Sequence, residues 1–102
     1  DAEFHLAIAE ASHNAVLLHT MRSLFTLLHE NIYSNLESVY RKRDTRQVIH
    51  DQHRVLLDTI VGENPEKARN AAHDHLTFVK EAIIEQSKDS TRQERAMRRS
   101  GI

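Results

Sequence analysis

The sequence has no cysteine or tryptophan, one proline, two glycines, two tyrosines and three phenylalanines. Without cysteine, a disulfide framework, thiolate metal ligation and thiol catalysis are excluded, so any bound metal must use histidine, carboxylate or water. The scarcity of turn residues and of aromatic or β-branched runs argues against a β protein, while leucine, alanine, glutamate and arginine favour helix. We therefore predict an all-α fold, an antiparallel helical bundle.

No apolar run approaches the length of a membrane span, and no apolar segment follows a basic start as in a signal peptide. We expect a cytoplasmic protein without a membrane partner. A chain of 102 residues with 39% hydrophobic content can bury one modest core. Because the sequence opens at Asp1, without methionine and already in a helical pattern, we expect it to be part of a longer protein.

Positive charge is unevenly distributed, although the net charge is only −1. Arginine and lysine are concentrated in the last fifteen residues, and the rest of the chain is correspondingly acidic. DNA binding by a folded body needs a basic face, which the body lacks. We therefore divide the chain into a helical domain, 1–87, and a basic tail, 88–102, that is a frayed helix end or a solvated extension.

Apolar residues recur at helical spacing in four segments. The first runs from Asp1 to about Ser12, and the second is a long helix from Ala15 with a bend near His29 to Asn31. The third is capped by Asp44 or Thr45 and ends at Gly62. The fourth runs from Pro65 through Ile83, with Asn64 as its N-cap.

Two pairs of residues have the spacing of metal ligands. Asp1 and His5 are four apart, so on a helix they share one face. His53 and His75 lie about ten residues before and after the Gly62 to Pro65 turn, so an antiparallel helix pair places them level. A lone histidine on an apolar face is usually a hydrogen-bonded core residue, but two facing imidazoles are costly to bury unless both rings find partners.

The neighbours at helical spacing decide which histidines point inward. His53 has Ile49, Leu56, Leu57 and Ile60 as neighbours, and His75 has Ala68, Ala71, Ala72, Val79 and Ala82. His73 lies among polar residues on the opposite face of its helix, and His50 lies at the edge of the inward face. We therefore predict that His53 and His75 face the core, whereas His73 is not a ligand.

Histidine and carboxylate ligands suit zinc, nickel, iron and manganese, and zinc is expected because it is abundant. Four protein ligands would leave a coordination position for water or an organic carboxylate. A metal-dependent hydrolase would also need a general base beside the metal-bound water, and no further acidic residue falls clearly on an inner face. We do not expect an enzyme.

The stretch from Asp1 to His19, DAEFHLAIAEASHNAVLLH, resembles the effector-binding FCD domain of FadR-type GntR transcription regulators. Gln52 to Ile60 is similar to the family's second signature, and Ala68 to Leu76 to its third, so the resemblance covers residues 1 to about 86. The tail, with Ser90 to Arg95, is most similar to pyruvate-responsive members of the family, with lactate-responsive members second.

The resemblance implies one aspartate and three histidines as metal ligands, which match Asp1, His5, His53 and His75. It also implies a homodimeric repressor whose winged-helix DNA-binding domain, absent from this chain, binds the operator. The effector would be a small carboxylate, with pyruvate preferred and lactate second. Asn14 is interpreted first as a helix cap and second as an effector-pocket residue. The alternatives are a structural dimerisation module with a fold-stabilising metal site and, less favoured, a metal-dependent hydrolase.

Overall fold

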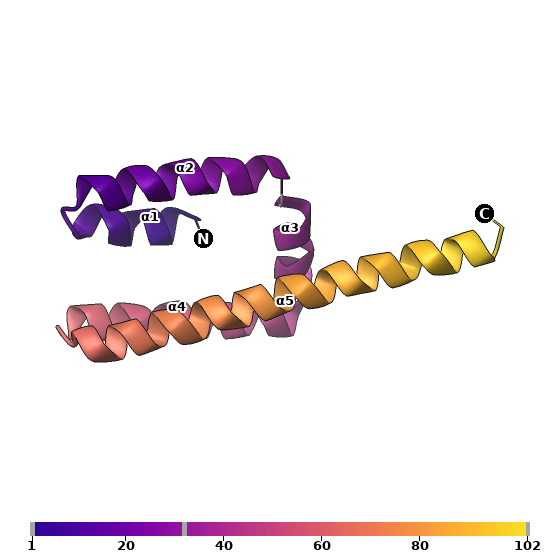
Figure 1. Cartoon of the computed structure of the whole chain (residues 1–102). Helices are drawn as coiled ribbons and strands as arrows, with labels where there is room; N and C mark the ends of the chain where they lie inside the picture. The colour runs from indigo at the N-terminus through magenta and orange to yellow at the C-terminus, as the bar shows by residue number, and fades with distance from the viewer. Residues whose placement is uncertain (1, 32, 102) are drawn as a thin grey trace. The chain divides into compact units, whose positions relative to one another are not determined.

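The computed structural model describes residues 2–31 and 33–101, and the side chains of these residues except those of 28–35. The described residues form five helices and no strand, which confirms the all-α prediction (Figure 1). The helices are α1 (Ala2–Ala11), α2 (Ala15–Asn31), α3 (Tyr33–Arg41), α4 (Arg43–Val61) and α5 (Pro65–Arg99). Within the described ranges no helix is both long enough and apolar enough to span a bilayer.

The chain divides into two compact units, Asp1–Ser34 and Asn35–Ile102. In the first unit α1 packs against α2, and in the second α4 packs against α5 as an antiparallel pair (Figure 1). The long second helix predicted from the sequence is two helices, because α2 ends at Asn31 and α3 begins at Tyr33. The break falls at the end of the predicted bend, and Ile32 is outside the described residues.

The predicted N-cap of the third sequence segment, which is α4, is wrong. Lys42 is the N-cap and makes no side-chain capping bond, and Asp44 lies in the first turn. The amide of Arg46 already donates to the carbonyl of Lys42 at 2.9 Å, so the helical ladder begins before Asp44. The carboxylate of Asp44 can still stabilise this end of α4 through the helix dipole.

The turn between α4 and α5 agrees with the predicted end of one helix and start of the next. Gly62 is the C-cap of α4, and its amide donates to the carbonyl of Asp58 at 2.9 Å. The left-handed conformation falls on Glu63, with φ of 53°. Asn64 then caps α5 by accepting a hydrogen bond from the amide of Lys67 at 3.0 Å, and Pro65 occupies the first turn.

Helix α5 continues well beyond the length of its partner. It has 35 residues and α4 has 19, so with the same rise of about 1.5 Å per residue in both helices nearly half of α5 extends past α4. Residues 91–101 are exposed. The basic segment 88–102 is thus helical through Arg99 and continuous with the helix before it.

The core of the second unit is small and includes two polar side chains. Val39, Ile49 and Leu56 are its buried hydrophobic residues, and His53 and His75 are buried with them. Leu57 and Ile60, expected on the same inner face, are 43% and 38% exposed. The buried stripe of α4 consists of positions 49, 53 and 56. Leu57 lies about 100° round the helix from Leu56, toward the edge of this stripe.

We expect Asn64→Ala to lower the free energy of unfolding by about 1 kcal/mol, because the amide of Lys67 loses its acceptor at the start of α5. Urea denaturation measures this change. Asn70→Ala is the matched control, since Asn70 is exposed within α5 and alanine favours helix there. Equal losses in both variants would contradict the capping role.

Candidate metal centre

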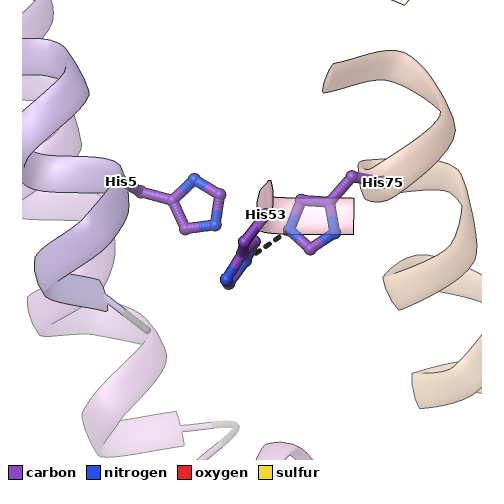
Figure 2. Close-up of side chains that lie close together, drawn as sticks. All are labelled: His5, His53 and His75. Carbon is purple, nitrogen blue, oxygen red and sulfur yellow. Dashed lines mark hydrogen bonds between the residues drawn. The ribbon is translucent and has the colours of Figure 1, made fainter. Parts of the chain in front are cut away.

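The α4–α5 turn brings His53 and His75 together, as their 22-residue separation predicts. Their Nε2 atoms lie 3.1 Å apart, and the ring centroids are 4.6 Å apart at an interplanar angle of 72° (Figure 2). The side chains are almost fully buried, with 8% and 2% of their surface exposed. The prediction that both histidines face the core is confirmed.

The helix faces explain why these two rings meet. On α4, His53 stands between the buried Ile49 and Leu56 at one-turn spacing, so the stripe that packs on α5 carries the imidazole inward. On α5, His75 is flanked by the half-buried Ala71 and Ala72, whose small side chains leave room for a ring from the partner helix. Both imidazoles are therefore fixed by packing on regular helices.

A third side chain, Gln52, also lies within hydrogen-bonding distance of the pair. The Oε1 atom of Gln52 lies 2.8 Å from Nδ1 of His75, so Nδ1–H can donate to this carbonyl oxygen. Gln52 was not among the predicted site residues. Helical spacing gives no signal for it, because position 52 lies about 100° round the helix from His53, and only the packing of α4 on α5 brings it to His75.

Burial lowers the pKa of both histidines. Desolvation is the main cause for His53, and the charge of nearby His50 acts in the same direction. For His75, desolvation again dominates and the charge of His53 adds to it. Both rings are therefore neutral at pH 7, the protonation state in which a ring nitrogen can bind a metal ion.

The geometry of the pair fits a shared divalent ion. At a metal–nitrogen distance of about 2.1 Å, two nitrogens on one ion lie about 3.0 Å apart at an octahedral angle and about 3.4 Å apart at a tetrahedral angle. The observed separation of 3.1 Å falls within this range. Two neutral nitrogens at that distance can hold an ion or, without one, share a single proton in a hydrogen bond.

The other two predicted ligands belong to the first unit. His5 is half-buried on α1, in edge contact with Phe4 at 5.5 Å between centroids and stacked on Phe25 at 6.2 Å. Asp1 lies outside the described residues. The membership of His5 and Asp1 in a metal site stays a prediction.

The remaining predicted residues are at the surface. His73 and His50 are exposed, as predicted from their polar neighbours. Asn14 is exposed, and its Oδ1 accepts a hydrogen bond from the amide of Leu17 at 3.0 Å, which confirms its interpretation as the cap of α2. A role for Asn14 in effector binding stays a prediction.

Because burial lowers both pKa values, the metal-free protein should lose stability in acid. Below about pH 6.5 the unfolded chain takes up protons that the folded pair resists, so unfolding becomes more favourable as the pH falls. We expect a lower urea midpoint at pH 5.5 than at pH 7.5 after chelator treatment. His73→Asn should keep this decline and His53→Asn should reduce it; equal declines in both variants would contradict the assignment.

Comparison with known proteins identifies the domain to which these helices belong. The family profile of the FCD domain matches residues 1–78. A protein of Escherichia coli K12 whose name assigns it to regulation of the L-lactate dehydrogenase operon is 37% identical over 101 residues, 99% of this chain and 39% of the relative.

Two further relatives are also named as transcription regulators. The Glc operon transcriptional activator of Escherichia coli K12 is 35% identical over 83 residues, 81% of this chain and 33% of its own length. The regulator LutR of Bacillus subtilis is 30% identical over 84 residues, 81% of this chain and 38% of its own length. No solved structure gives a significant match. The chain spans less than two fifths of the length of each of these three relatives. It belongs to the FCD domain family.

Proposed function

We propose that this chain is the effector-sensing part of a dimeric transcription regulator, in which a divalent metal ion at His53 and His75 receives the carboxylate of a small organic acid. The observation that carries the proposal is the buried, neutral histidine pair on the packed helices α4 and α5. Membership of the FCD domain family and the names of the relatives as operon regulators support it.

The proposed ligand set is Asp1, His5, His53 and His75. The first two come from the spacing at the start of α1 and from the family resemblance, and the last two already face each other. Zinc is the expected ion, with nickel, manganese and iron as alternatives. When bound, such an ion polarises and orients a carboxylate at a position that the protein ligands leave open.

The effector is proposed to be a small carboxylate, with pyruvate first and L-lactate second, as the resemblance of the tail indicates. One relative's name refers to the L-lactate dehydrogenase operon, which gives weight to the second acid. The two acids have the same length and carboxylate and differ at the adjacent carbon, so a metal site could distinguish them by the keto or hydroxyl oxygen beside the carboxylate.

The link to DNA would run through parts of the protein outside this chain. We assign operator binding to an N-terminal winged-helix domain, as the family resemblance implies, and we assign the sensing helices and the dimer contacts to this chain. An acid can change operator affinity only if it binds one dimer geometry more tightly than another. His53 and His75 sit on neighbouring helices, so a ligand that shifts one ring relative to the other would bias that geometry.

His53→Ala and His75→Ala should each reduce bound zinc to background after dialysis, because each removes one buried nitrogen ligand. His73→Ala is the matched control: it lies on the same helix as His75 but is exposed, and should retain zinc. Elemental analysis of the dialysed proteins, with circular dichroism to check folding, gives the result. Equal zinc content in all three variants would refute the site.

Calorimetric titration with pyruvate and L-lactate tests the sensor itself. We expect saturable binding of one acid to the zinc-loaded protein and at least a tenfold loss after zinc is removed. Acetate, which lacks an oxygen on the adjacent carbon, is the control acid and should bind more weakly. Zinc binding without any acid binding would favour the alternative of a structural dimerisation module, whereas zinc-dependent hydrolysis of a test ester would favour an enzyme.

A further inference from the structure

We infer that Gln52 is a positioning residue, which holds His75 in the tautomer that leaves Nε2 unprotonated and aimed at the bound cation. The inference rests on the proposed function, since it concerns how the same site is prepared for a metal ion. It follows from two distances in the second unit: 2.8 Å from Gln52 Oε1 to His75 Nδ1, and 3.1 Å between the Nε2 atoms of His53 and His75.

The position of the single proton on the neutral ring of His75 decides what Nε2 can do. If Nδ1 carries the proton, it donates to Oε1 of Gln52, and Nε2 presents a lone pair toward His53. If Nε2 carries the proton, Nδ1 becomes an acceptor facing another acceptor, the carbonyl oxygen of Gln52. With the amide oriented as observed, that arrangement loses a hydrogen bond in a buried site, so this orientation of Gln52 favours the first tautomer.

The same proton placement on His75 determines which nitrogen of His53 carries a proton. With Nε2 of His75 unprotonated, the hydrogen bond between the rings requires Nε2–H of His53 to donate. This proton must therefore move to Nδ1 of His53, with the ring staying neutral, before its Nε2 can bind an ion. The two histidines thus differ, since His75 already presents an unprotonated Nε2 and His53 must first change tautomer.

The surroundings of Gln52 tolerate substitution. Gln52 lines an open groove of about 330 Å³ that is also lined by Asp51 and Asp74. The groove also has space for side chains of similar length at position 52.

The test compares Gln52→Met, which keeps the length and removes the acceptor, with Gln52→Glu, which keeps an acceptor. Gln47→Met is the matched control: Gln47 is an exposed amide on α4 whose Nε2 donates to Asp51 Oδ1 at 3.0 Å, and it has no bond to either buried histidine. Zinc affinity is measured by competition with a chromophoric chelator. In the zinc-free proteins, ¹⁵N chemical shifts of the His75 ring, assigned with His75→Ala, report the tautomer.

We expect Gln52→Met to weaken zinc binding roughly 10- to 100-fold, the usual effect of losing a hydrogen-bond partner behind a ligating histidine. Its His75 shifts should change from a protonated Nδ1 to a mixture of tautomers. Gln52→Glu should keep a protonated Nδ1 and bind zinc at least as tightly as the unchanged protein. Gln47→Met should match the unchanged protein in both measurements.

Unchanged His75 shifts in Gln52→Met, with or without a loss of affinity, would overturn the positioning role. A loss of affinity in Gln52→Glu equal to that in Gln52→Met would also overturn it, because an acceptor is still present. No zinc binding by the unchanged protein would refute the proposed function, while the ring shifts would still decide whether Gln52 selects the tautomer.

Discussion

The contact between His53 and His75 is the constraint on which the second unit depends. Two imidazoles occupy the centre of a helix pair whose buried apolar side chains are few. A polar group is tolerated in such a position only when its hydrogen-bonding atoms have partners. The rings provide partners for each other, and Gln52 provides one for Nδ1 of His75, so the packing of α4 on α5 and the polar network are a single structure.

The turn between the two helices determines whether this contact can form. The capping bonds at Gly62 and Asn64 end one helix and begin the next within a few residues, so the register of α4 against α5 is set close to the turn. A register shift by a single residue would turn one histidine by about 100° away from the other. The contact between the two histidines therefore depends on the register that the short turn sets.

The histidine pair also limits how much hydrophobic burial can stabilise the core. Replacing apolar side chains with two histidines gives up hydrophobic stabilisation that a leucine pair would provide, and burial resists their protonation. Functional sites commonly depart from what stability alone would select. A pair of neutral, pre-positioned nitrogens is what the proposed metal site would need.

How far the sequence alone leads can be judged at particular residues. Helical spacing predicted the all-α class, the Asn64 cap, the Asn14 cap and the inward faces of His53 and His75, because each depends on local periodicity or on one short turn. The start of α4 was predicted wrongly, because Asp44 can act either as a cap or as a first-turn residue. Only tertiary structure brought Gln52 against His75, left Leu57 and Ile60 exposed, and set the 3.1 Å separation of the rings. These features depend on how two helices pack against each other, and a pattern along one chain does not contain that information.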